Sequence, residues 1–166
     1  MSVHIQDSPA RAYREAGEAG DLDALMATLA PDAAFHSPLS ATAGFTGERD
    51  LRELFGVVLG VVRGMRYHTD VGDDRVRMLA ATARVGRQEL EESALLRFGE
   101  HGLVEEITLW VRPLPGLTAL MAAIGTGLAR GRRGLPLLVG AATGTLHAMT
   151  RAGDRTLVPL LTNRSS

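Results

Sequence analysis

Apolar residues recur along the chain with two different periods, which separates helical stretches from strands. From Ser8 to Pro31 they recur every three or four residues, which predicts two short helices. The first begins at Ser8-Pro9 and ends at Gly20, and Tyr13 lies on its apolar stripe. Asp21 is expected to cap the second helix, and Pro31 to close it. The apolar face of this second helix consists of Leu22, Leu25, Met26 and Leu29.

A period of two follows and predicts a strand over residues 33–39. Because strand side chains alternate, Phe35 and Ser37 share one face and His36 lies on the other. After a turn-rich segment, Thr46 is expected to cap a third helix, whose apolar positions extend from Leu51 to Val62 at helical spacing.

The stretch from Met65 to Val111 predicts a meander of four strands. The strands cover residues 65–71, 76–85, 90–98 and 103–111, with glycine-containing turns between them. In the first of these strands the inward set is expected to be Met65, Tyr67, Thr69 and Val71, which places His68 outside. Helix, helix, strand, helix and then four strands is an α+β order, with helices on one face of a curved sheet.

Beyond Pro115 the pattern becomes helical again. Leu117, Leu120, Met121, Ile124 and Leu128 form one stripe, and a second apolar block covers residues 135–149. Neither block reaches the roughly 18 uninterrupted apolar residues of a membrane span. Packing of these helices against protein is favoured, and contact with a membrane surface is the less favoured alternative. We therefore expect a domain over residues 1–115 and a helical extension over residues 116–166.

The amino-acid composition excludes several classes of catalytic and binding chemistry. A chain of 166 residues fits one domain with a real core. It has no cysteine and no lysine, which excludes thiolate nucleophiles, zinc–cysteine sites, Schiff-base catalysis and a Walker phosphate loop. The net charge of −1 with scattered arginines disfavours nucleic acid as a partner. The first twenty residues contain no signal-type apolar core, so a cytoplasmic location is expected. The Ala, Gly and Arg richness is typical of a bacterial genome of high GC content.

The opening of the chain is similar to that of a known superfamily. Tyr13, the run Ala19-Gly20-Asp21-Leu22-Asp23 and the strand ending at Ser37-Pro38 resemble the nuclear transport factor 2-like (NTF2-like) superfamily. Its members include ketosteroid isomerases, SnoaL-like cyclases and limonene epoxide hydrolases. The likeness runs from about Tyr13 to about Pro113. It implies a cone-shaped, curved antiparallel sheet with N-terminal helices, a cystatin-like α+β roll that encloses an apolar pocket.

The comparison with ketosteroid isomerases transfers only one of their three catalytic roles. It places Tyr13 at the position of their oxyanion-hole tyrosine, Ser37 at the position of the base and Ala94 at the position of the second donor. A serine hydroxyl is not a base near neutral pH without help, and alanine has no proton to donate. The alternative for Tyr13 is a structural tyrosine that fills the cone and bonds to a neighbour.

Limonene epoxide hydrolases provide a second comparison. Ile107-Thr108-Leu109-Trp110 resembles their last strand, and Arg84-Val85-Gly86 resembles their Arg-x-Asp segment. Arg84 matches, whereas Gly86 and Arg112 replace the two acids, so their mechanism is not transferable. Arg84 is a candidate pocket residue, with an outward-facing strand residue as the alternative.

One carboxylate remains for acid–base chemistry. If Ala94 points inward, Glu92 does too, and burial would raise its pKa into a useful range. The alternative is an exposed acid in the cluster of residues 89–92. No His pair has metal-ligand spacing, so a metal site is not expected. The residues expected to line the substrate pocket are Phe35, Ser37, Phe55, Tyr67, Arg84, Ala94, Ile107, Leu109 and Val111.

Together these observations favour a cofactor-free enzyme of secondary metabolism. It would be an isomerase, a cyclase or an epoxide-opening hydrolase acting on a small hydrophobic, polyketide- or terpenoid-like ligand, with Tyr13 as oxyanion donor and Glu92 as acid or base. The alternative is a non-catalytic domain that binds a hydrophobic ligand or docks to a protein. A homodimer is expected through the outer face of the last strand, which carries Glu106, Thr108, Trp110 and Arg112.

Overall fold

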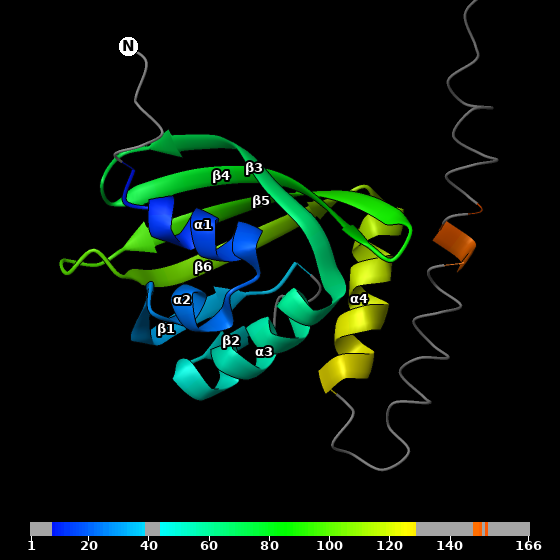
Figure 1. Cartoon of the computed structure of the whole chain (residues 1–166), viewed down its shortest axis with the longest axis horizontal. Helices are drawn as coiled ribbons and strands as arrows, with labels where there is room; N and C mark the ends of the chain where they lie inside the picture. The colour runs from blue at the N-terminus through cyan, green and yellow to red at the C-terminus, as the bar shows by residue number, and fades with distance from the viewer. Residues whose placement is uncertain (1–7, 39–43, 129–147, 151, 153–166) are drawn as a thin grey trace, which may run out of the picture.

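The computed structural model describes residues 8–38, 44–128, 148–150 and 152. Three helices, α1 (Arg11–Ala19), α2 (Leu22–Met26) and α3 (Glu48–Val61), lie on one face of a curved sheet (Figure 1). The strands are β1 (Leu29–His36), β2 (Gly44–Thr46), β3 (Val62–Gly72), β4 (Val76–Val85), β5 (Gln88–Phe98) and β6 (Val104–Arg112). A fourth helix, α4 (Leu114–Leu128), packs against α3 and the strands β4, β5 and β6. The predicted α+β class, with a curved, unclosed sheet, is confirmed.

The sheet has the strand order β2-β1-β6-β5-β4-β3. The predicted antiparallel meander is present as β3 to β6. The expectation of a wholly antiparallel sheet is corrected at one place, because β1 pairs with β6 in parallel. A parallel neighbour follows from the topology, since β2 and α3 lie between β1 and the meander and bring the chain back to the far edge.

Two predicted boundaries near the N-terminus are wrong. Leu29 and Pro31 belong to β1, and not to the end of the second helix. Proline is accommodated there because the β1–β6 register shifts between Leu29 and Ala34, so a ladder donor is not required at Pro31. Thr46 does not cap the third helix. It ends β2, and Gly47 precedes α3 with a positive φ of 83°, a conformation that glycine adopts without steric cost.

The face assignment of β3 is correct up to Tyr67 and then reverses. Met65 is buried and His68 is exposed, as expected. The β3–β4 register shifts between Tyr67 and Thr69, which changes the phase of alternation. Asp70 is therefore buried, and Val71 is 56% exposed although the alternation had placed it inside.

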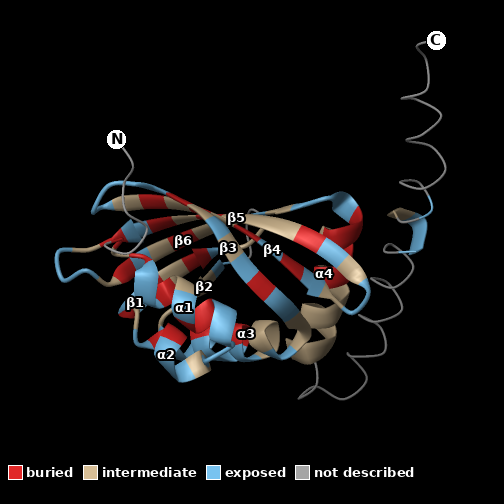
Figure 2. Ribbon diagram, turned by 45° about the horizontal axis from the view of Figure 1, so that its top comes forward, coloured by how far each residue is buried: buried red, intermediate tan, exposed pale blue. Residues whose placement is uncertain are grey.

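The core fills the space between the helices and the concave face of the sheet. Buried positions alternate with exposed ones along the strands (Figure 2). Phe35 packs edge-on against Phe45 and Phe55, with ring centroids 6.3 and 5.9 Å apart. A second, smaller cluster beside α4 contains Met65, Ala81, Ala83, Leu90 and Leu120. The second apolar block of the C-terminal extension, over residues 135–149, lies almost entirely outside the described residues.

Candidate functional site

An apolar cavity of about 300 Å³ lies between the concave face of the sheet and the helices. Its walls come from all four helices and from the strands β1, β2, β3, β5 and β6. Most of the lining is aliphatic or aromatic. Among the described residues that line it, the polar side chains are Tyr13, Ser37, Tyr67 and Glu92.

Glu92 lies on the inner face of β5 and lines this cavity. Burial raises the pKa of its carboxyl from 4.5 to about 7, and a hydrogen bond from the Tyr67 hydroxyl opposes part of this shift. The structure therefore places the Glu92 side chain inside the cone and not in an exposed acidic cluster. A carboxyl with a pKa near 7 can exist in both protonation states at neutral pH, which is the property that general acid–base catalysis requires.

Tyr67 reaches Glu92 across an intervening strand. In the sheet register, Tyr67 of β3 lies opposite Ala81 of β4, which in turn lies opposite Glu92 of β5. Ala81 is fully buried and carries only a methyl group. This small residue leaves the space above β4 in which the phenol and the carboxylate meet.

Tyr13 completes the polar group of the cavity from the opposite wall, α1. Its side chain is buried, and burial together with the negative charge of Glu92 raises its pKa further above the ordinary value. The pKa of Tyr67 is raised too, first by burial and then by the charges of Tyr13 and Glu92. Both phenols are therefore neutral hydrogen-bond donors over the whole neutral range.

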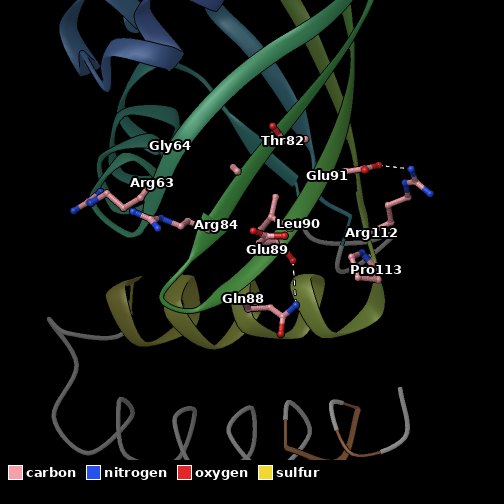
Figure 3. A pocket seen from close by; sticks show the side chains of 11 residues that line it. Arg63, Gly64, Thr82, Arg84, Gln88, Glu89, Leu90, Glu91, Arg112 and Pro113 are labelled. Carbon is pink, nitrogen blue, oxygen red and sulfur yellow. Dashed lines mark hydrogen bonds and ion pairs between the residues drawn. The ribbon is translucent and has the colours of Figure 1, made fainter. Parts of the chain in front are cut away.

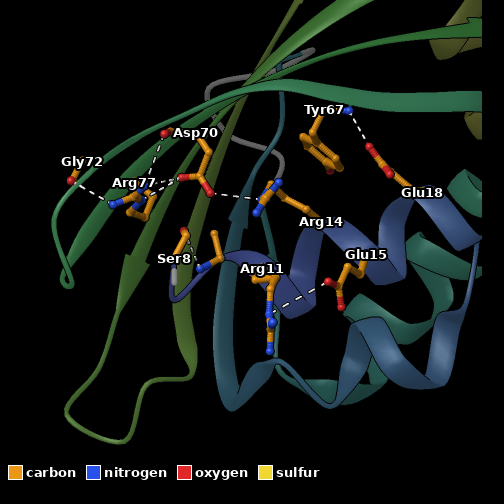
Figure 4. Close-up of polar contacts among 10 residues, drawn as sticks. Ser8, Arg11, Arg14, Glu15, Glu18, Tyr67, Asp70, Gly72 and Arg77 are labelled. Carbon is orange, nitrogen blue, oxygen red and sulfur yellow. Dashed lines mark hydrogen bonds and ion pairs between the residues drawn. The ribbon is translucent and has the colours of Figure 1, made fainter. Parts of the chain in front are cut away.

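Two polar contacts attach α1 to β3 (Figure 4). Near the start of the helix, Arg14 Nε lies 3.0 Å from Asp70 Oδ2, and both side chains are largely buried. At its end, Glu18 Oε1 accepts a hydrogen bond of 2.8 Å from the Tyr67 backbone N–H. These contacts fix the helix that carries Tyr13 relative to the strand that carries Tyr67.

Asp70 is itself held by a second arginine. Arg77 Nε donates a hydrogen bond of 2.7 Å to Asp70 Oδ1, and Arg77 Nη1 donates one of 2.8 Å to the Gly72 carbonyl. Arg77 and Asp70 are 3% and 1% exposed at their side chains. The residue pattern did not indicate this buried network, because Asp70 becomes internal only through the register shift in β3.

Most residues predicted to line the pocket do so. Phe35, Ser37, Phe55, Tyr67 and Leu109 line the cavity. Ala94 and Ile107 are fully buried in the core but do not reach the cavity surface, and Val111 packs beside the second cluster. The predicted place of Arg84 in the pocket is wrong. In β4 the inward positions are Ala81 and Ala83, so Arg84 is exposed on the other face.

The residues that α4 contributes to the cavity were not predicted as site residues. Leu120, Met121, Ile124, Gly125 and Leu128 all line it. Their helical stripe was recognisable in the sequence, but the surface that the stripe covers was not. Gly17 was missed as well. A Cβ atom at Gly17 would lie 3.2 Å from the Tyr67 hydroxyl, so glycine leaves room for that side chain.

A larger, open hollow of about 710 Å³ lies outside the cone, at the ends of β3, β4 and β5 (Figure 3). Three of its charged side chains, Arg63, Glu91 and Arg112, already have partners. Arg112 forms an ion pair with Glu91, and Arg63 donates to the carbonyls of Leu59, Gly60 and Val62. The smaller apolar cavity is therefore the better candidate site, because it contains the titratable group whose pKa is shifted into the neutral range.

Two further observations concern the described part of the chain. No group of three or more His, Asp or Glu side chains there is arranged to bind a metal ion. None of its helices is long and apolar enough to cross a membrane.

Comparison with known proteins identifies relatives of this fold. A family model described as the SnoaL-like domain matches residues 10–107. A search of the curated proteins found no match. Among solved structures, the chain is similar to a steroid delta-isomerase from Pseudomonas aeruginosa, at 29% identity and a TM-score of 0.67, over 77% of this chain and 96% of that one.

Two more distant structures share the fold. An uncharacterised protein with a cystatin-like fold from Silicibacter pomeroyi is 24% identical, with a TM-score of 0.68 over 81% of this chain and 93% of that one. The epoxide hydrolase/cyclase-like enzyme SalBIII, which is described in pyran ring formation in the polyether salinomycin, is 15% identical. It has a TM-score of 0.55 over 63% of this chain and 88% of that one.

Proposed function

The chain belongs to the SnoaL-like domain family of the NTF2-like superfamily, and from this premise we propose that it is a cofactor-free enzyme that moves a proton on an apolar small molecule. The reaction would be an isomerisation, a cyclisation or the opening of an epoxide. The names of the structural neighbours, an isomerase and an epoxide hydrolase/cyclase-like enzyme, support this range. The observation that carries the proposal is the Glu92 carboxyl, whose pKa is raised to about 7 in an apolar cavity.

The proposed roles follow from the protonation states of the three groups. On a carbonyl substrate, the Glu92 carboxylate removes a proton from the carbon next to the carbonyl. The electron pair of the broken C–H bond moves to the carbonyl oxygen and forms an enolate. The Tyr13 hydroxyl donates a hydrogen bond to that oxygen, and a preformed donor in a dry site is worth about two to three orders of magnitude in rate.

Glu92, now a neutral acid, completes the reaction by returning its proton. In a β,γ-unsaturated carbonyl substrate the enolate is conjugated with the C=C bond, so return of the proton to the γ-carbon shifts the double bond and gives an isomer. Attack of the enolate carbon on a second carbonyl instead closes a ring and leaves an alkoxide that takes the proton. In both cases the atoms balance without an added cofactor. Tyr67 donates a hydrogen bond to the Glu92 carboxylate and so stabilises the basic form of the dyad.

Hydrogen–deuterium exchange of a simple ketone tests this chemistry without knowledge of the natural substrate. The α-protons of 2-tetralone are followed by NMR in D₂O. We expect the protein to accelerate their exchange, and Glu92→Gln to return the rate to that of buffer. Tyr13→Phe should lower it by about 10²-fold. Glu91→Gln is the matched control, because Glu91 lies next to Glu92 on the opposite face and pairs with Arg112.

The second candidate function is non-catalytic binding of a hydrophobic ligand. It is favoured by the lining itself, which is apolar except for four side chains, and by the absence of the familiar acids at Ser37 and Ala94. Binding of 2-tetralone without any acceleration of exchange would support this alternative and reject the enzyme.

We also propose that the protein is a homodimer, with the outer face of β6 as the interface. Trp110 is 49% exposed there and lies opposite Ser93 in the register, with Glu106, Thr108 and Arg112 on the same face. A large exposed aromatic side chain among polar residues is typical of an interface. Trp110→Glu should convert the dimer to a monomer in light scattering, and a wild-type monomer would reject this interface.

A further inference from the structure

We propose that α4 is a specificity-determining wall of the ligand cavity, and that Met121, Ile124 and Leu128 set the size of the ligand. This proposal deepens the proposed function and rests on its assignment of the cavity as the ligand site. The helix lies beyond the residues that match the SnoaL-like domain, which end at residue 107. The cavity of this chain is therefore completed by a segment outside the matched region.

The cavity-facing residues of α4 form one face of the helix. Leu120, Met121, Ile124 and Leu128 recur at intervals of one, three and four residues, which is the spacing of a single helical stripe. Ile124 also packs against both core clusters, and so connects the wall to the rest of the interior. The side chains on this stripe are flexible or branched hydrocarbons, and their volumes decide how much space remains above the sheet.

Two glycines, one near each end of α4, allow this helix to pack closely against the rest of the domain. A Cβ atom at Gly116 would lie 2.8 Å from Leu90 Cβ, and one at Gly127 would lie 2.3 Å from Val57 Cγ1. The helix backbone is thus in direct contact with β5 at its start and with α3 near its end. Such close contact makes α4 part of the wall and gives its side chains defined positions in the cavity.

The chemistry of the wall indicates the class of ligand that it accepts. The side chains that α4 places in the cavity are all apolar, and among the described lining residues the one ionisable acid is Glu92 and no arginine is present. A charged group next to α4 would lose its hydration without gaining a partner. The ligand is therefore an uncharged molecule whose hydrocarbon body contacts α4, while an oxygen atom faces the phenols and Glu92.

Two neutral probes of different size test the wall. 2-Naphthol has two rings and 19-nortestosterone has four, and the binding of each is measured by fluorescence or calorimetry. Ile124→Trp and Met121→Trp add bulk to the cavity. We expect each to weaken binding of the four-ring probe at least tenfold more than binding of the two-ring probe. Leu114→Trp is the matched control, because Leu114 begins the same helix but is 58% exposed.

Thermal unfolding by circular dichroism verifies that each variant is folded. Unchanged affinity for both probes in folded Ile124→Trp and Met121→Trp would overturn the proposal, and so would equal losses for both probes. Failure of the wild type to bind either probe would overturn it too. The exchange of 2-tetralone protons is a separate measurement. Size-selective binding without exchange would therefore remove the catalytic function and leave the wall in place.

Discussion

The hydroxyl of Tyr67 donates a hydrogen bond to the carboxylate of Glu92, although a whole strand separates the two residues in the sheet. The contact is possible because Ala81 lies between the two residues in the sheet and carries only a methyl group, which leaves space for the phenol and the carboxylate to meet. The acid–base group of the cavity is thus a dyad built across three strands.

The titration of Glu92 should show both the burial and the hydrogen bond. A carboxyl-carbon NMR titration, assigned with Glu92→Gln, is expected to give a pKa of about 7. Tyr67→Phe should raise the pKa further, because the hydrogen bond from Tyr67 stabilises the charged form. A Glu92 that titrates near 4.5 in the wild type would contradict the dyad and favour the binding alternative.

The same shift predicts how stability depends on pH. The folded protein retains the Glu92 proton between pH 4.5 and about 7, where the unfolded chain has lost it. Wild-type stability should therefore fall, relative to Glu92→Gln, by up to about 3 kcal/mol as the pH rises through this window. Urea unfolding at pH 4, 6 and 8 measures the difference. Parallel curves for the two proteins would show that Glu92 is not buried in its neutral form.

The buried network around Asp70 should be important for stability. Asp70→Asn leaves Arg77 and Arg14 in a largely buried site without their carboxylate, and breaking such a pair typically costs about 3–5 kcal/mol. The matched control is Asp23→Asn at the solvent-exposed pair with Arg52, for which we expect less than about 1 kcal/mol. Equal effects in urea unfolding would mean that the Asp70 network is not desolvated.

The sequence was sufficient for those parts of the fold that a local pattern determines. The stripe through Tyr13 and the alternation around Glu92 each depend on neighbouring residues, and both placed the side chain on the correct face. The pairing of β1 with β6 has no such local signal. It depends on where the chain returns after β2 and α3. Pro31 is itself a signal against a strand, and it fits into β1 only because the β1–β6 register shifts there.

The candidate site was predictable to the same extent. Alternation identified Glu92 as the pocket acid, but it also placed Val71 inside, because a one-residue irregularity in β3 cannot be read from the residue pattern. Arg84 was misplaced for a different reason: a likeness to another enzyme's motif outweighed its own position in an alternating strand. The α4 wall was missed because amphipathic spacing shows that a helix must cover something, without showing what.

Steroid isomerisation should be negligible despite the likeness to a steroid delta-isomerase. The expected base position carries Ser37, which directly follows β1, and Ala94 replaces the second donor, whereas Glu92 approaches the cavity from β5. The ultraviolet assay with a 5-ene-3-ketosteroid should therefore give a rate close to that of buffer. Isomerisation that is detectable and survives Tyr13→Phe would overturn this assignment of the residues.

The boundary at residue 115 predicts that the cone folds without the segment that follows it. Among the described residues, the buried members of the larger core cluster all lie between Ala10 and Ile107, and α4 adds Leu120 to the smaller cluster. A chain ending after Pro115 should thus retain its sheet signal in circular dichroism. It should also bind an apolar dye such as 8-anilinonaphthalene-1-sulfonate more strongly, because Met65, Ala83 and Leu90 lose their cover.

A chain ending after Leu128 is the control, since it retains α4 and should bind little additional dye. Loss of the sheet signal in the shorter chain alone would show that α4 is an integral part of the domain and that the boundary lies after it.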